Sequence, residues 1–348
     1  MKNYAIQAIN LNKTFQKKNE IVNALSSFEI YIPKGTIYGL LGPNGAGKST
    51  FINILGGLVK KNSGTVKISD LDIDKYSKET RRRIGIVPQE LNIDPFFTPN
   101  ELLELQAGLY GIKKKNRKTE ELLSKVGLLD QRNAYARTLS GGMRRRLLIA
   151  KALVHDPEII ILDEPTAGVD VELRYNLWEY VKELNKNGKT ICLTTHYLEE
   201  AENLCEFITI INKGKIIKSD TKTNLLNFFG KKTVIFELDN NINIPKELNI
   251  YETIIEKKKL IVNYDKNKTK LSNIIKILNQ NKITYNEIST KESDLENVFL
   301  KLLKDHGSNK KFFYIFNSFY PGNFNFRSCF ARFDNYFCID FFFIFIIL

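Results

Sequence analysis

The fold is decided by the stretch Gly42-Pro43-Asn44-Gly45-Ala46-Gly47-Lys48-Ser49-Thr50. This stretch matches the phosphate-binding pattern G-x-x-x-x-G-K-[ST] in full. Residues 36–41 before it predict a buried strand, and residues 51–55 after it predict the start of a helix. In that setting glycines let backbone N–H groups surround phosphate oxygens, Lys48 can reach the β- and γ-phosphates, and the Ser49 hydroxyl can bind Mg²⁺. The stretch therefore predicts a nucleoside triphosphate site.

Two carboxylates follow a second predicted buried strand. The run over 158–163 is rich in isoleucine, as expected for a parallel strand buried on both faces, and Asp163 and Glu164 lie at its end. Asp163 can hold Mg²⁺ through water, and Glu164 can act as the general base toward the water that attacks the γ-phosphate. The alternative is an acidic pair at a helix N-terminus, which the complete phosphate loop disfavours.

Other polar residues lie beside predicted strands and helices. Ser140, Gly141 and Gly142 precede an amphipathic helix and form a second anion cradle, which makes sense if it closes over the nucleotide of another copy. His196 follows the predicted strand 190–195 and could touch the γ-phosphate, although a lone His there is more often a surface or capping residue. Gln89 could approach Mg²⁺ and the attacking water, but alone it would be unremarkable.

The order of predicted elements indicates an α/β fold. Strands at 84–87, 158–163, 190–195 and 207–211 alternate with helices at 174–185 and 198–205, which predicts a mainly parallel core sheet with helices on both faces. Residues 4–9 and 24–32 predict strands of an N-terminal sheet with one wet face. Residues 99–154 predict helices, the first capped by Thr98 with Pro99 in its first turn.

Together these motifs resemble the nucleotide-binding domain of ATP-binding cassette (ABC) transporters, over about residues 3–220. GPNGAGKST is similar to the family's Walker A motif, IIILDE to its Walker B motif with the catalytic glutamate at Glu164, and LSGGM to its signature sequence. Met143 stands where Gln is commonest in the signature. Gln89 falls at the Q-loop, Ala167-Gly168-Val169-Asp170 at the D-loop, and His196 at the switch histidine.

The resemblance implies ATP and Mg²⁺ as ligands. Phe15 lies where the family has an aromatic residue that stacks on adenine, more usually a Tyr. The residues expected in catalysis are Glu164, His196 and Gln89, and those expected around Mg²⁺ are Ser49, Gln89 and Asp163. The residues expected to contact ATP are Phe15, Gly42, Pro43, Asn44, Gly45, Ala46, Gly47, Lys48, Ser49, Thr50, Ser140, Gly141 and Gly142.

The resemblance also implies a P-loop NTPase fold with an N-terminal antiparallel β subdomain and an inserted helical subdomain at about 90–155. Two copies would form a head-to-tail dimer that sandwiches two ATP molecules, closing on ATP binding and reopening on hydrolysis. The helical subdomain would contact a membrane permease. Because residues 1–305 contain no apolar stretch long enough to cross a bilayer, the permease is expected to be a separate chain, with this chain in the cytoplasm on the inner face of the cell membrane.

A branch of the family is also indicated. Residues 293–300 (SDLENVFL) resemble the C-terminal motif of ATPase subunits from ABC-2 type export systems, and DEPTAGVD and LSGGMRRR are typical of that branch. Export is therefore expected. A soluble ABC ATPase acting on the ribosome would normally carry two cassettes, a DNA-repair ABC ATPase a long coiled coil, and a regulatory subunit would have lost Glu164 or Lys48.

Composition sets broader limits. The chain has 348 residues, enough for two domains, and a net charge of +13 from scattered basic residues. This scatter favours a solvated surface, with proximity to an anionic membrane as the second possibility, and no nucleic-acid partner is expected. Its four cysteines form no C-x-x-C pair, so neither a zinc site nor a disulfide framework is indicated. This usage fits a reduced, cytosolic compartment.

The C-terminal part divides in two by composition. A first domain, the ATPase, is expected over 1–230, and strands and a helix at 270–280 predict a small α+β domain over 231–305. Residues 306–348 are crowded with Phe and lack periodicity. This tail fits an amphipathic membrane contact, a disordered end, or an out-of-frame translation; the abrupt change of composition favours the last.

Overall fold

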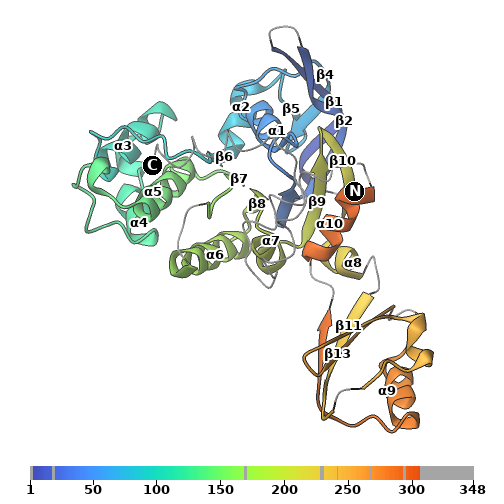
Figure 1. Cartoon of the computed structure of the whole chain (residues 1–348). Helices are drawn as coiled ribbons and strands as arrows, with labels where there is room; N and C mark the ends of the chain where they lie inside the picture. The colour runs from blue at the N-terminus through green and yellow to red at the C-terminus, as the bar shows by residue number, and fades with distance from the viewer. Residues whose placement is uncertain are drawn as a thin grey trace, which may run out of the picture. The chain divides into compact units, whose positions relative to one another are not determined.

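Three β-sheets and a group of helices organise the chain (Figure 1). The predicted fold, with a parallel core sheet and antiparallel sheets beside it, is confirmed. The residues that this computed structural model describes are 3–17, 20–167, 171–227, 231–240, 242–265, 268–292 and 295–305.

The N-terminal sheet is antiparallel and has the strand order β2-β1-β4-β5. Phe28, Ile30 and Ile32 face the core while Glu29 and Tyr31 face solvent, as expected for a sheet with one wet face. The first two strands extend well beyond the predicted ranges. The strands are β1 (Tyr4–Lys17), β2 (Glu20–Pro33), β4 (Ser63–Ile68) and β5 (Leu71–Asp72).

The central sheet has the order β10-β9-β3-β8-β7-β6 and is parallel except for the β9–β10 hairpin. Three adjacent strands, β3, β8 and β7, are buried at every position, which accounts for their continuous apolar sequences. The strands are β3 (Ile37–Leu41), β6 (Ile84–Val87), β7 (Ile159–Asp163), β8 (Thr190–Thr195), β9 (Phe207–Asn212) and β10 (Lys215–Thr221). The helices among them are α1 (Lys48–Leu55), α2 (Ser77–Arg83), α6 (Val171–Lys186), α7 (Leu198–Leu204) and α8 (Lys222–Asn227).

Three helices inserted between β6 and β7 form a group of their own in Figure 1: α3 (Pro99–Leu109), α4 (Thr119–Lys125) and α5 (Gly141–Leu153). The predicted start of the first is confirmed, because Thr98 and Glu101 form a reciprocal capping box with Pro99 at the first position. Leu102 is buried in this group. Leu105 and Leu109 of the same helix are 49% and 75% exposed.

The C-terminal sheet has the order β12-β13-β11-β14 and is wholly antiparallel. Its buried side chains form a cluster with those of the helix predicted at 270–280, in which Ile274 and Leu278 are fully buried. The elements are β11 (Lys231–Leu238), β12 (Glu252–Glu256), β13 (Lys259–Asp265), α9 (Leu271–Gln280) and β14 (Tyr285–Glu292).

A last helix, α10 (Leu295–Asp305), follows this sheet. The backbone N–H of Leu295 donates to the carboxylate of Glu202 in α7, so the start of α10 is tied to the first domain. The domain boundaries at residues 230 and 305 stay a prediction. The Phe-rich tail over 306–348 lies outside the described residues.

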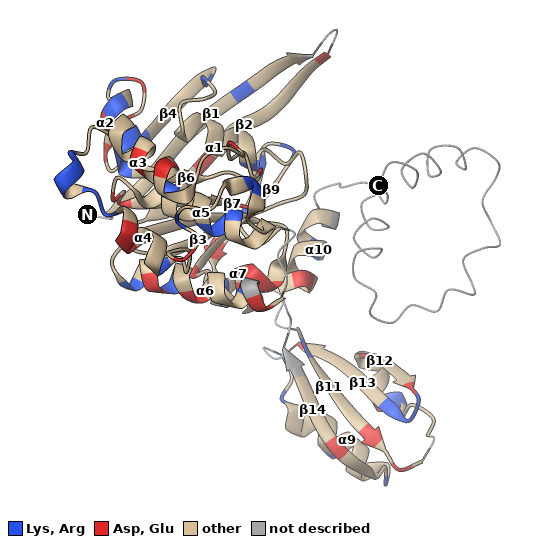
Figure 2. Cartoon of the chain, turned by 90° about the vertical axis from the view of Figure 1, so that its left-hand side faces the viewer, with Lys and Arg blue, Asp and Glu red and all other residues tan. Residues whose placement is uncertain are grey.

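Charged residues of both signs are spread over many elements, as Figure 2 shows, in keeping with the predicted solvated surface. Basic residues concentrate on α2, where Arg81, Arg82 and Arg83 occupy the last turn. None of the described helices has the length and apolar character needed to span a bilayer.

Candidate functional site

The predicted catalytic residues follow neighbouring parallel strands. Strands β3, β8, β7 and β6 are adjacent in the central sheet, so their carboxyl ends meet at one edge. The phosphate loop follows β3, His196 follows β8, Asp163 and Glu164 end β7, and Gln89 lies just after β6. Ligand sites in open α/β sheets are built at this edge.

The phosphate loop is closely packed against two other segments. Gly47 has φ +111°, and a Cβ at this position would lie 2.6 Å from the carbonyl oxygen of Ala24. A Cβ on Gly42 would lie 2.4 Å from the carbonyl oxygen of Ile211. The turn between β9 and β10 also holds the loop, because the Gly214 N–H donates to the Ala46 carbonyl at 2.8 Å. Only glycine fits the two tight positions of the loop.

The remaining residues of the loop differ in exposure. Lys48 is buried, whereas Asn44, Gly45 and Ser49 are exposed. Pro43 and Thr50 are half-buried. The loop therefore presents its backbone and the Ser49 hydroxyl outward at the start of α1, where a helix N-terminus favours anions.

Lys48 lies over the loop and faces the acidic pair. Its Nζ donates to the carbonyl oxygens of Gly42 at 2.7 Å and Pro43 at 3.3 Å, and lies 3.9 Å from Glu164 Oε1. Burial lowers the pKa of Lys48, and the charges of Glu164 and Asp163 oppose that shift. The Lys48 ammonium is therefore a buried cation between the start of the loop and Glu164.

Glu164 is held from several sides. It has φ +48°, and its N–H donates to the Thr194 carbonyl at 3.0 Å. The Gln89 side-chain amide donates to Oε2 at 2.9 Å, and His196 Nδ1 lies 3.1 Å from Oε1. The contact with His196 lowers the pKa of Glu164, as do the charges of Lys48 and Arg145, while burial opposes this. The carboxylate is therefore ionised near neutral pH, as a general base requires.

Two residues that sequence reasoning missed support these carboxylates. The Thr194 hydroxyl donates to Asp163, and the Glu164 N–H approaches the same hydroxyl at 3.2 Å. Arg145 in α5 is buried near Asp163 and Glu164. Nothing in the sequence distinguishes Thr194 from the next threonine or Arg145 from its two arginine neighbours, so only the fold identifies them.

The second cradle lies in the helical group. The Ser140 hydroxyl caps α5 by accepting from the Met143 N–H at 3.2 Å, and Ser140 and Gly141 are exposed. Gly142 is half-buried in the first turn. These residues begin a helix of a different group from the phosphate loop (Figure 1), and the predicted second cradle lies at the exposed start of that helix.

Two predicted positions remain outside this arrangement. Phe15 is 40% exposed on β1, with the Lys13 ammonium 4.7 Å from its ring centroid. In the D-loop segment the Ala167 N–H donates to the Glu164 carbonyl at 3.2 Å. Residues 168–170 lie outside the described part of the chain.

Comparison with known proteins agrees with this geometry. The sequence matches the ABC transporter family model over residues 25–167. It is 41% identical over 240 residues to the linearmycin resistance ATP-binding protein LnrL of Bacillus subtilis (strain 168), covering 68% of this chain and 76% of that protein. It is 32% identical over 312 residues to the daunorubicin resistance ATP-binding protein DrrA2 of Streptomyces coeruleorubidus, covering 87% of this chain and 96% of that protein.

A solved structure is also similar. The dimeric post-hydrolysis state of the ATP-binding cassette MJ0796 bound to ADP and Pi matches with a TM-score of 0.57 at 30% identity, covering 62% of this chain and 98% of that one. None of these three proteins is named for action on the ribosome, and the resistance proteins agree with the predicted ABC-2 export branch. The chain belongs to the ABC transporter family, as an ATP-binding and ATP-hydrolysing subunit.

Proposed function

We propose that this subunit powers an exporter by closing a head-to-tail dimer on ATP and reopening it after hydrolysis. The observation that carries the proposal is the convergence of Lys48, Gln89 and His196 on Glu164 at one edge of the sheet, with the Ser140 cradle exposed elsewhere. In this proposal the cradle of one copy covers the catalytic edge of the other. The dimeric state of the MJ0796 cassette supports the pairing of two copies.

In this proposal each residue at the edge has a distinct role. The N–H groups of the loop and the Lys48 ammonium bind the triphosphate, and Glu164 accepts a proton from the attacking water. His196 orients Glu164 from 3.1 Å and touches the γ-phosphate. Phe15, exposed on β1, stacks on adenine. Ser140, Gly141 and Gly142 contact the nucleotide held by the partner copy.

The donors at this edge fit Mg²⁺. The Ser49 hydroxyl, the Gln89 side-chain carbonyl and the Asp163 carboxylate are hard oxygen donors of the kind that Mg²⁺ binds in nucleotide sites. Asp163 is buried and its carboxylate is fixed by the Thr194 hydroxyl. When bound, the ion would neutralise charge that develops on the phosphates. These three residues would hold it.

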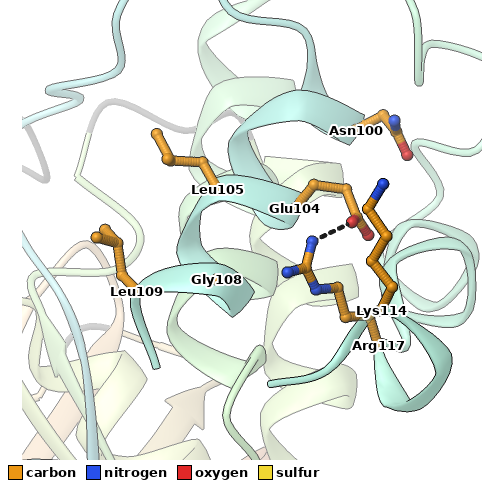
Figure 3. Close-up of a pocket in the computed structure, with 7 residues that line it drawn as sticks. All are labelled: Asn100, Glu104, Leu105, Gly108, Leu109, Lys114 and Arg117. Carbon is orange, nitrogen blue, oxygen red and sulfur yellow. Dashed lines mark hydrogen bonds and ion pairs between the residues drawn. The ribbon is translucent and has the colours of Figure 1, made fainter. Parts of the chain in front are cut away.

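A groove on α3 suits contact with a permease (Figure 3). Figure 3 shows Leu105 and Leu109 on one side of the groove and the Glu104–Arg117 ion pair on the other, whose atoms are 2.6 Å apart. Exposed apolar side chains rimmed by charges are typical of interaction sites. We place a separate permease chain here, which would locate the subunit on the cytoplasmic face of the membrane. Leu105→Asp should reduce co-purification with the permease and leave the ATPase activity of the subunit alone unchanged.

The experiment that tests the proposal uses Glu164→Gln in the full chain. This variant should bind ATP, lose hydrolysis by about 10²-fold or more because the general base is gone, and accumulate as a dimer in size-exclusion chromatography. Ser140→Arg is the matched control, since it should keep ATP binding by the monomer and prevent dimer formation. Rapid hydrolysis by Glu164→Gln would remove Glu164 from the role of base.

The direction of transport needs a separate test. Membrane vesicles that contain the subunit with its permease should move substrate in the export direction when ATP is supplied on the side of the subunit. ATP-driven uptake in the opposite direction would contradict the export branch.

A further inference from the structure

Three consecutive arginines occupy the first half of α5, and they are placed differently. Arg145 is buried, with 4% of its surface exposed, whereas Arg144 and Arg146 are half-buried. Arg146 Nη1 donates at 2.8 Å to the Val126 carbonyl, within the helical group. Arg145 Nη1 donates at 2.8 Å to the carbonyl of Pro88, in the segment after β6. Arg145 therefore joins the helix that begins at Ser140 to the catalytic edge.

The contact continues directly to the general base. Pro88 is followed by Gln89, whose amide donates to Glu164 Oε2 at 2.9 Å. His196 lies against the other oxygen, Oε1, so both carboxylate oxygens are engaged. A water that gives its proton to Glu164 needs one of these oxygens. The Gln89 amide takes one of the acceptor positions of Oε2, so the position of the 88–89 backbone affects how accessible Oε2 is to the attacking water.

The positive charge of Arg145 lies among acidic side chains. Burial penalises its guanidinium, and the acidic groups that offset the penalty are Asp163, Glu164 and Glu200. A buried guanidinium that lost its acceptor or its acidic neighbours would leave an uncompensated charge, so the contact between Arg145 and Pro88 is expected to persist. Arg145 lies five positions after Ser140, which is about 7.5 Å along the helix, so a shift at the cradle reaches Arg145 through the backbone of α5.

We infer that Arg145 is a positioning residue that couples the Ser140 cradle to Glu164 through the Pro88–Gln89 segment. The inference rests on the proposed function, in which the cradle closes over the nucleotide of a partner copy. When the cradle is filled, α5 moves, the Pro88 carbonyl follows the guanidinium of Arg145, and the amide of Gln89 leaves Oε2. Oε2 of each Glu164 then becomes accessible to water only when the cradle on the same chain is occupied. Hydrolysis at the two sites of the dimer is therefore coupled.

The test compares Arg145→Met with Arg146→Met in the purified full chain, by steady-state ATP hydrolysis. Both variants lose one 2.8 Å hydrogen bond from α5 to a backbone carbonyl. Arg145→Met should lower kcat about tenfold, the effect of one hydrogen bond from a charged donor, while KM for ATP stays within about twofold. Arg146→Met should leave kcat within about twofold. Equal losses in the two variants would overturn the inference.

A double-substitution cycle tests the route. If Arg145 acts through Gln89, adding Arg145→Met to Gln89→Ala should lower kcat by less than about twofold further, against tenfold alone. A tenfold loss in both backgrounds would overturn the coupling. Arg145→Lys, which keeps the charge without the planar fork, replaces the methionine variant if circular dichroism shows that the latter does not fold.

The inference and the proposed function fail in different ways. Arg145→Met combined with Glu164→Gln should still form the ATP-dependent dimer, because a positioning residue does not bind the nucleotide. Normal turnover by Glu164→Gln alone would refute the proposed function. A wild-type kcat in Arg145→Met, with turnover abolished by Glu164→Gln, would refute only the role of Arg145.

Discussion

Replacing Gly47 by alanine should cost much more stability than replacing Gly45, two residues away in the same loop. Both glycines have positive φ, +111° for Gly47 and +78° for Gly45. A Cβ on Gly45 would meet nothing within 4 Å, whereas one on Gly47 would lie 2.6 Å from the Ala24 carbonyl oxygen and 2.9 Å from a methyl of Leu25. The pair therefore separates backbone strain from steric collision.

The expected magnitudes follow from these two contributions. Gly45→Ala should lower the free energy of unfolding by about 1–2 kcal/mol, because alanine must adopt a left-handed backbone conformation there. Gly47→Ala carries a backbone term of about 1–3 kcal/mol, because its φ is sparsely populated by residues with a Cβ. The collision adds about 1–3 kcal/mol, since the backbone of β2 must move. The free energy of unfolding should therefore fall by about 2–6 kcal/mol for Gly47→Ala.

Urea unfolding measures the difference. The chain has one tryptophan, Trp178, which is buried in α6 with its Nε1 3.3 Å from Glu200, so its fluorescence reports unfolding of the domain that holds the loop. ATP binding by equilibrium titration should weaken in Gly47→Ala, because the backbone N–H groups of the loop are displaced. Equal losses in the two variants, within about 0.5 kcal/mol, would refute the packing of the loop against β2.

Other predictions concern the groups around the acidic pair. Thr194→Val should lower kcat about tenfold, since it removes the hydroxyl that donates to Asp163, and Thr194→Ser should restore the rate. His196→Ala should move the acidic limb of the kcat–pH profile to higher pH, because the His196 contact is the main cause of the lowered pKa of Glu164; an unmoved limb would contradict this. Burial raises the pKa of Glu200, so the folded state keeps a proton that the unfolded state has lost, and thermal stability should fall as pH rises from the ordinary pKa of a glutamate to the raised one. Glu200→Gln should abolish that pH dependence, as differential scanning calorimetry at several pH values would show.

Local sequence patterns were sufficient to predict the parallel core and to place polar residues at the carboxyl ends of its strands. The buried strands β3, β7 and β8 have continuous apolar sequences, and Asp163 ends β7 with Glu164 directly after it. Because the carboxyl ends of parallel strands share an edge, their order in the chain was enough to bring Glu164 and His196 near the phosphate loop, but the role expected of His196 came from the family resemblance.

Other elements have no comparable local signal. β1 and β2 form a long hairpin that extends to Lys17 and Glu20. In its outer part Phe15, Ile21 and Val22 are exposed, so the sequence there has no alternation of buried and exposed residues that would predict a strand. The contact of Arg145 with Pro88 joins residues 57 positions apart and depends on how α5 packs beside β6. Periodicity along one segment cannot reveal a hydrogen bond between two segments.

The turn at Gly214 has a consequence for biosynthesis. It lies far along the chain from the phosphate loop, yet its N–H holds Ala46, its carbonyl accepts from Ser26, and a Cβ here would lie 2.6 Å from the Ala24 carbonyl oxygen. A chain emerging from the ribosome therefore cannot complete its phosphate loop until the β9–β10 hairpin has been synthesised and has folded back. The nascent subunit would acquire its full affinity for ATP only after β10 has been synthesised, and a fragment that stopped after β7 would contain the whole Walker A sequence without the contacts from Gly214.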